Sequence, residues 1–177
     1  MHNELWPSLA EIPHLIYKSI RDAIKSHEGR NLFCLPSAIL GEETPRTVFV
    51  TSELHEIVNG PPWPNTWEGR RYAALRGLLD GFTEGDTITI ALDPFDKDPS
   101  AMMARVHPVE DEVWDFRSIE AKSALRVFGR FSEPDTFIGL TWNYREILDW
   151  NEEVHGCKEE WNKTVPSYPP VRWKGAQ

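Results

Sequence analysis

Apolar and polar positions alternate between residues 113 and 142, and this pattern predicts three short antiparallel strands. Residues two apart share a face of a strand, because successive side chains point to opposite sides. One face collects the apolar side chains of the first two strands: Trp114, Phe116, Leu125, Val127 and Phe131. The other face carries Asp115, Arg117, Arg126, Phe128 and Arg130. With turns expected at residues 120–123 and 132–135, the pattern predicts a core face and an arginine face.

Upstream, β-branched and aromatic residues predict a strand over residues 47–51, followed by a short helix over 52–58. A proline-rich connector over 59–66 leads to a second helix over 67–82, with Asn65 or Thr66 as its N-cap. Trp63 and Trp67 in this region either pin the connector to the core or offer a stacking surface for a base. Two extended runs, 87–92 and 102–109, flank the acidic loop DPFDKDPS.

Both ends of the chain carry predicted helices outside this pattern. Apolar residues recur at helical spacing over residues 8–28, and Gly29 is a natural stop. This helix either packs on its own domain or binds a partner, including a second copy of the chain. Residues 144–154 also have a helical pattern, and the proline-rich tail from residue 164 predicts irregular structure.

We therefore expect an α+β fold with three parts. Residues 1–45 form an N-terminal helical extension, and residues 46–150 form a domain with a small antiparallel sheet whose helices pack on one face. Residues 151–177 supply a helix end and the proline-rich tail. A chain of 177 residues with 40% hydrophobic content and 8 Trp is long enough and apolar enough to bury such a core.

The net charge of −9 argues against a simple nucleic-acid binder, because such proteins usually present a basic surface to phosphates. The acidic residues, however, cluster in predicted turns while the arginines lie inside strands, which allows a positive groove within an acidic protein. No apolar run is long enough to span a membrane, and the N-terminus lacks the pattern of a secretory signal. We expect a cytoplasmic protein with no membrane association.

The cysteines and histidines indicate no metal or cofactor. Cys34 and Cys157 stand far apart without a second thiol nearby, and the six histidines form no closely spaced pair. The sequence therefore predicts neither a disulfide framework nor a metal site.

Two short motifs in this order resemble a known family. Trp114-Asp115-Phe116-Arg117 resembles a strand of the type tryptophan-glutamate-leucine-arginine, and Leu125-Arg126-Val127-Phe128 resembles tyrosine-arginine-valine-phenylalanine. Both types occur in RelE/ParE-like toxins of toxin–antitoxin modules, particularly the HigB-like and phage Gp49-like branch. Residues 137–140 resemble that family's final core strand, so the resemblance extends over about residues 47–149.

The resemblance implies a metal-independent endoribonuclease that cleaves mRNA, often on the ribosome, and that is held by an antitoxin protein. By the motif match, Arg117 and Arg126 would hold phosphate, and Arg130 joins them as a residue of the same strand face. Tyr144 or Arg145, beyond the last strand, would stack on a base or complete the site. We assign Arg76 and Trp142 to RNA binding. Residues 140–145 hold neither the histidine nor the lysine that many family members carry there, so the proton-transfer group is unassigned.

Other functions fit the same sequence. Arg117 and Arg126 would also stabilise the sheet simply by pairing with Asp115, since cross-strand opposite charges contribute roughly 0.2 to 1 kcal/mol. A toxin-like fold without catalysis would bind a protein partner through its aromatic surface or its N-terminal helix. A phage or mobile-element inhibitor would instead imitate nucleic acid with the loop carboxylates of Asp93, Asp96 and Asp98.

Overall fold

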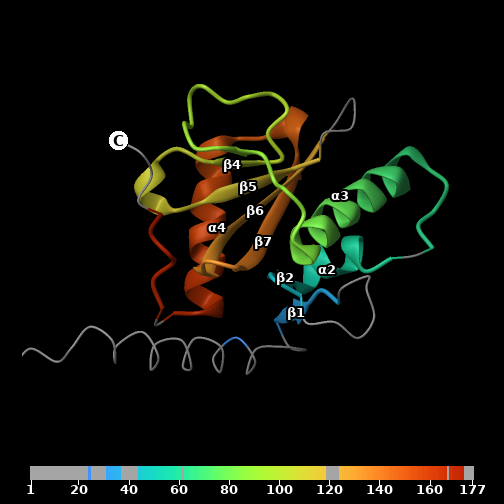
Figure 1. The fold of residues 1–177 in the computed structure, drawn as a ribbon, viewed down its shortest axis with the longest axis horizontal. Helices are drawn as coiled ribbons and strands as arrows, with labels where there is room; N and C mark the ends of the chain where they lie inside the picture. The colour runs from blue at the N-terminus through green and yellow to red at the C-terminus, as the bar shows by residue number, and fades with distance from the viewer. Residues whose placement is uncertain are drawn as a thin grey trace, which may run out of the picture.

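A seven-stranded mixed sheet is the centre of the fold in the computed structural model, which describes residues 24, 31–36, 44–60, 62–118, 124–166 and 168–173. The strands are β1 (Leu32–Cys34), β2 (Thr47–Thr51), β3 (Ile90–Ala91), β4 (Met103–Arg105), β5 (Trp114–Arg117), β6 (Leu125–Glu133) and β7 (Thr136–Tyr144). They lie in the order β1-β2-β7-β6-β5-β4-β3 (Figure 1). The pairs β2–β7 and β3–β4 are parallel, and the other four pairs are antiparallel.

The antiparallel β5–β6–β7 arrangement and the strand over residues 47–51 confirm the sequence predictions. The sheet is nevertheless wider than the small antiparallel sheet expected, and two of its strand pairs are parallel. β1 lies in a stretch that received no assignment from its pattern, and it pairs with β2 across the boundary predicted at residue 45. The extended run over residues 87–92 contributes only two residues to the sheet, those of β3.

Helices cover both faces of the sheet, so the prediction of helices on one face was wrong. α2 (Ser52–Val58) and α3 (Trp67–Glu84) pack on one face, and α4 (Trp150–Thr164) packs on the other (Figure 1). The Thr66 hydroxyl accepts a hydrogen bond from the Gly69 backbone N–H at 3.1 Å and so caps α3. Gly85 ends that helix with a φ of 88°, a conformation that glycine adopts without strain.

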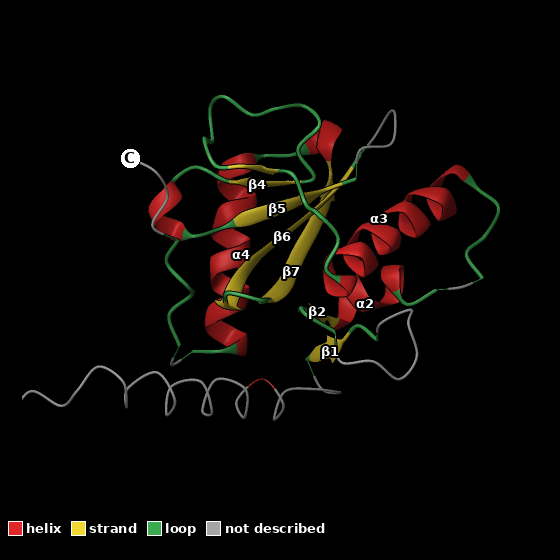
Figure 2. Ribbon diagram, viewed as in Figure 1, coloured by secondary structure: helices red, strands yellow, loops and turns green. Residues whose placement is uncertain are grey.

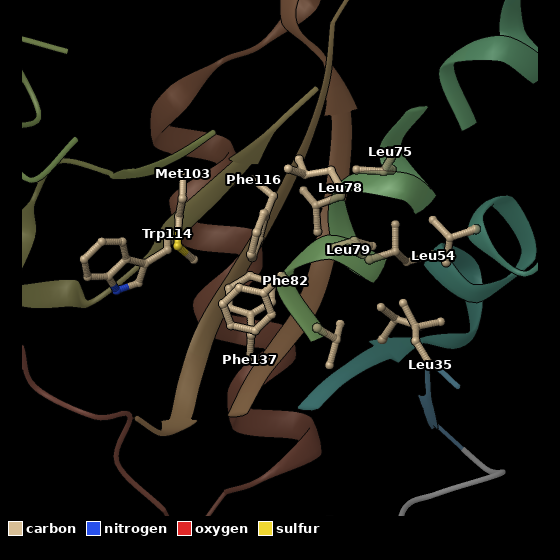
Figure 3. Close-up of a cluster of buried hydrophobic side chains, with 14 of the residues drawn as sticks. Leu35, Leu54, Leu75, Leu78, Leu79, Phe82, Met103, Trp114, Phe116 and Phe137 are labelled. Atoms are coloured by element: carbon tan, nitrogen blue, oxygen red, sulfur yellow. The ribbon is translucent and has the colours of Figure 1, made fainter. Parts of the chain in front are cut away.

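Each face of the sheet has its own hydrophobic cluster. On the α2 and α3 face, Phe82 packs among strand residues that include Phe116 and Phe137 (Figure 3). On the α4 face, strand residues such as Phe128 and Ile138 belong to one cluster with Val154, Cys157 and Trp161 of α4. Ile24 is buried in this second cluster; the rest of the helix predicted over residues 8–28 lies outside the described residues.

The last helix begins later and runs longer than its sequence pattern predicted. β7 continues to Tyr144, a 3₁₀ turn η2 (Arg145–Ile147) follows, and only then does α4 start. The Asp149 carboxylate sets this start by accepting hydrogen bonds from the backbone N–H groups of Asn151 and Glu152, at 2.9 and 3.2 Å. What we expected to be a helix end before the tail is therefore a full helix, and it forms one layer of the fold.

The described part of the tail is irregular, as predicted, and packs against the fold. Trp161 of α4 donates its indole N–H to the Tyr168 carbonyl at 2.9 Å, and the Val171 backbone N–H donates to the Phe131 carbonyl at 2.8 Å. The Trp173 ring lies 5.8 Å from the Trp114 ring and 5.4 Å from the Phe131 ring, between centroids. Among the described residues, no helix has the length and apolar character to cross a membrane.

A β-bulge changes which face the end of β7 presents. Phe128 pairs with Thr141, but the next residue, Gly129, pairs with Gly139, so Leu140 is an extra residue in β7. Before the bulge, the side chains of Ile138 and Leu140 face α4. After it, Trp142 and Tyr144 pack with the α3-side cluster. The bulge therefore reverses the inside–outside pattern of the strand.

Candidate functional site

A pocket of about 490 Å³ on the α4 face of the sheet is lined by residues of the loop between β3 and β4 and of the start of α4. Figure 2 shows the backbone of this loop above the sheet, on the side where α4 starts. Cationic side chains line part of it: Lys97, Arg117, Arg126 and Arg145. The rest of the lining is aromatic, apolar or neutral: Pro94, Phe95, Pro99, Val106, His107, Trp150 and Asn151. Among the described residues, no carboxylate lines this pocket.

Beneath the pocket, Asp115 and Arg126 form a buried ion pair between β5 and β6. The Asp115 Oδ2 atom accepts a hydrogen bond from Arg126 Nη1 at 2.7 Å, and the two side chains are 0% and 4% exposed. Burial raises the pKa of Asp115, an effect opposed by the neighbouring cations of Arg126, Lys97 and Arg117. The Asp115 Oδ1 and Arg126 Nε atoms are buried without a hydrogen-bond partner. The pairing with Asp115, which the sequence offered as an alternative to phosphate binding, is thus present for Arg126.

Arg117 lies next to this pair but contacts it less closely. Its Nε atom is 3.8 Å from Asp115 Oδ2, and its Nη1 atom donates to the Asp98 carbonyl at 3.1 Å. Arg117 therefore joins the sheet to the loop that contributes Lys97. A second, longer hydrogen bond from Nη1 reaches the Ala101 carbonyl at 3.4 Å.

Arg145 is the most exposed of the three arginines. Its backbone N–H donates to the Ala124 carbonyl at 2.9 Å, which fixes the chain as it leaves β7. Its guanidinium forms no ion pair with any described carboxylate. Burial lowers the pKa of Arg126, and the charges of Arg117 and Arg145 add to that effect. The charges of Arg117 and Arg145 therefore reach Arg126, and all three arginines line the same pocket.

Lys97 is a site residue that the sequence pattern did not single out. Its half-buried side chain comes from the loop DPFDKDPS, where a single cation stands among acidic residues. Two of these acids stabilise the loop itself: Asp93 accepts from the Phe95 and Asp96 backbone N–H groups at 2.7 and 3.1 Å, and Asp98 accepts from the Ser100 N–H at 2.8 Å. The sequence feature that could have identified Lys97 is a lone lysine among aspartates that form turns.

The sequence pattern also did not identify two aromatic residues at the edge of the pocket. Phe95 is 80% exposed, and its ring centroid lies 4.9 Å from that of His107. Trp150 is 41% exposed at the first turn of α4, and the Lys97 ammonium lies 5.2 Å from its ring centroid. Exposed rings beside a cationic pocket suit the binding of an unstacked base.

Two of the predicted arginines lie elsewhere and have structural contacts. Arg130 donates from Nε and Nη2 to the Asp111 carbonyl in η1 (Val109–Asp111), and its guanidinium lies 5.4 Å from the Trp161 ring centroid. Arg76 on α3 pairs with Asp80 at 2.7 Å and donates to the Val58 and Pro36 carbonyls at 3.1 and 2.8 Å. Neither arginine lines the cationic pocket.

Trp142 and Tyr144 are placed on the opposite face of the sheet from the pocket by the bulge in β7. Their ring centroids are 5.7 Å apart, and the Arg71 guanidinium lies 5.2 Å from the Tyr144 ring. The pKa of Tyr72 is raised to about 12, mainly by burial and also by a hydrogen bond with Tyr144. Trp63 donates to the Ile57 carbonyl at 3.1 Å, which pins the proline-rich connector.

The pocket thus combines three of the seven predicted site residues, Arg117, Arg126 and Arg145, with Lys97 and an aromatic edge. Its lining carries four formal positive charges in a chain whose net charge is −9. Such a lining attracts an anion, and the guanidinium groups have the geometry to hold a phosphate through paired hydrogen bonds. The described residues contain no group of three or more potential metal ligands. Comparison with protein-family models, with curated proteins and with solved structures found no match to this chain.

Proposed function

We propose that this chain is a metal-independent endoribonuclease resembling the RelE/ParE-like toxins, and that the pocket beside α4 binds the phosphodiester to be cut. The observation that carries the proposal is the convergence of Arg117, Arg126, Arg145 and Lys97 on one pocket with no carboxylate in its described lining. The buried Asp115 carboxylate offsets part of the electrostatic repulsion among these four cations, and a bound anion would relieve the rest.

The residue types suit cleavage of RNA by its own 2′-hydroxyl. RNA supplies the nucleophile, so the protein has to orient the chain, stabilise the negative charge that develops on the phosphate and protonate the leaving oxygen. Arg117 and Arg126 are held by the sheet and by Asp115, which fixes their positions before substrate binds. Arg145 has no ion-pair partner among the described carboxylates and would approach the phosphate from the solvent side.

The aromatic edge would bind the base next to the cleaved bond. Phe95 and Trp150 present exposed rings from the loop and from α4, and base–aromatic stacking contributes about 1 to 3 kcal/mol per base. As the RelE/ParE-like resemblance implies, the substrate would be mRNA, on or off the ribosome, and an antitoxin protein would be the natural partner in the cytoplasm. A homodimer through the N-terminal helix is part of the same hypothesis.

Arg145→Ala tests this function with the least disturbance of the fold. Loss of one group that stabilises transition-state charge typically costs about 10²- to 10³-fold in rate, and we expect a loss in that range. Single-turnover cleavage of an mRNA fragment, with and without ribosomes, and growth arrest on expression are the measurements. Arg70→Ala is the matched control, since Arg70 is also exposed but lies on α3, on the other side of the sheet.

The outcomes separate catalysis from binding. Cleavage by the wild type and by Arg70→Ala, with a large loss in Arg145→Ala, supports the proposal. A folded wild-type protein that binds RNA through the pocket but never cleaves it would leave only the noncatalytic binding module. Equal activity of the two arginine variants would remove Arg145 from the site.

A further inference from the structure

Lys97 differs from the two other described lysines in its surroundings. Lys158 and Lys163 form ion pairs with Asp111 and Glu160, at 2.7 and 3.4 Å. Lys97 forms no ion pair with a described carboxylate; its ammonium instead lies over the ring of Trp150, 5.2 Å from the centroid. Lys97 is thus half-buried in the same pocket lining as the arginines, and no described carboxylate contacts its ammonium group.

The electrostatic surroundings make this lysine a better proton donor than an exposed one. Burial lowers the pKa of Lys97, and the charges of Arg117 and Arg126 lower it further, against an opposing effect of Asp115. Two carboxylates of its own loop, Asp93 and Asp98, accept hydrogen bonds from loop N–H groups, and none of the described carboxylates forms an ion pair with Lys97. From α4, the lining residues Trp150 and Asn151 contribute no charge to the pocket.

We propose that Lys97 is the proton donor of this pocket, delivering its proton to the 5′-oxygen that leaves when RNA is cut. This inference rests on the proposed function. In the step, the 2′-oxygen forms a bond to phosphorus, the bond from phosphorus to the 5′-oxygen breaks, and the Lys97 ammonium protonates that oxygen. The 2′-hydroxyl proton passes to water, and the neutral amine regains a proton from solvent. The products are a 2′,3′-cyclic phosphate and a 5′-hydroxyl.

The other groups in the pocket fit this role less well. Arginine side chains hold their protons too tightly to donate them efficiently, so Arg117, Arg126 and Arg145 serve charge stabilisation. His107 lies at the exposed rim against Phe95 and has no described contact with the arginines. Lys97, by contrast, lies close enough to Arg117 and Arg126 for their charges to act on its pKa.

The test uses Lys97→Arg with two RNA substrates that differ in one atom. Arginine keeps the positive charge but donates protons poorly, so the variant separates charge from proton transfer. One substrate has the natural 5′-oxygen at the cleavage site; the other has sulfur there, which leaves as a thiolate without a proton because thiols are far more acidic than alcohols. We expect Lys97→Arg to lose about 10²-fold or more on the oxygen substrate and less than about tenfold on the sulfur substrate.

The pH dependence gives a second readout. Because the protonated lysine is the active form, kcat/KM falls as the pH rises through the lowered pKa of Lys97, below the ordinary lysine value of about 10.4. That alkaline limb is expected to disappear in Lys97→Arg. Lys158→Arg, whose lysine is on α4 and is paired with Asp111, should keep the wild-type profile.

Different negative results identify whether the proton-donor role or the nuclease function is wrong. If the wild type cleaves RNA but Lys97→Arg changes both substrates by the same factor, the proton-donor role is overturned and the nuclease function stands. If His107→Gln, not Lys97→Arg, shows the selective loss on the oxygen substrate, the donor is the histidine. A wild type that cleaves neither substrate overturns the nuclease function and the role of Lys97 together.

Discussion

Replacing Asp115 by alanine is expected to lower the free energy of unfolding by about 3 to 5 kcal/mol, because the change leaves the Arg126 guanidinium buried without its partner. The pair is almost completely shielded from water, with 0% and 4% side-chain exposure and a 2.7 Å contact. Hydration can therefore replace little of the lost Asp115 charge. Urea denaturation of the two proteins, followed by circular dichroism, measures the difference.

A double substitution gives the matched control for this prediction. In Asp115→Leu with Arg126→Met, both charges are replaced by apolar side chains, and we expect most of the lost stability to return, since such replacements are often neutral. Asp96→Ala, in the exposed part of the loop, should leave the urea midpoint close to that of the wild type. A loss below about 1 kcal/mol in Asp115→Ala would show that water reaches the pair.

This pair also decides which variants can report on function. The motif match makes Arg126 the obvious residue for a loss-of-activity test, but its removal would leave the buried Asp115 carboxylate unpaired. Inactivity of such a variant would then follow from unfolding as readily as from a missing phosphate contact. Arg145 and Lys97 have no ion-pair partner among the described residues, so their variants separate the two causes.

The fold was predictable from the sequence wherever the pattern of one segment was sufficient. Alternation identified β5 and β6, and the helical spacing after Asn65 or Thr66 identified α3 to within two residues. The strand β1 was not predictable in this way, because three residues beside Pro36 carry too little pattern. The helix α4 was predicted to start too early and to be too short, because its capping residue, Asp149, lies in the middle of a helical pattern.

The candidate site was predictable only in part, because strand alternation fails at a bulge and does not apply to a loop. Arg117 and Arg126 follow from strand alternation, which assigns both to the face opposite the apolar side chains of β5 and β6. Trp142 and Tyr144 were also assigned to the site, with Tyr144 expected beyond the last strand, but β7 continues to Tyr144 and contains a bulge. The extra residue Leu140 reverses the faces; Gly139, a glycine inside the strand pattern beside it, is a local signal of such a bulge, and the strand prediction made no use of it. Lys97 comes from a loop, where no period relates sequence to position.

Gly129→Ala is expected to cost about 3 kcal/mol or more, at or beyond the upper end of ordinary overpacking, because the bulge brings β7 onto Gly129 itself. A Cβ atom there would lie 2.1 Å from the Ile138 carbonyl oxygen and 2.5 Å from Cζ of Phe137. The first of these atoms belongs to the backbone of the paired strand, so relief of the clash requires β6 and β7 to separate at the bulge.

Gly77→Ala is the matched control. A Cβ atom at residue 77 would meet no atom within 4 Å, and in the middle of α3 the change should stabilise the protein by about 0.5 to 1 kcal/mol. Urea denaturation should therefore give opposite signs for the same chemical change. Equal effects would mean that the close approach of β7 to Gly129 is absent in solution.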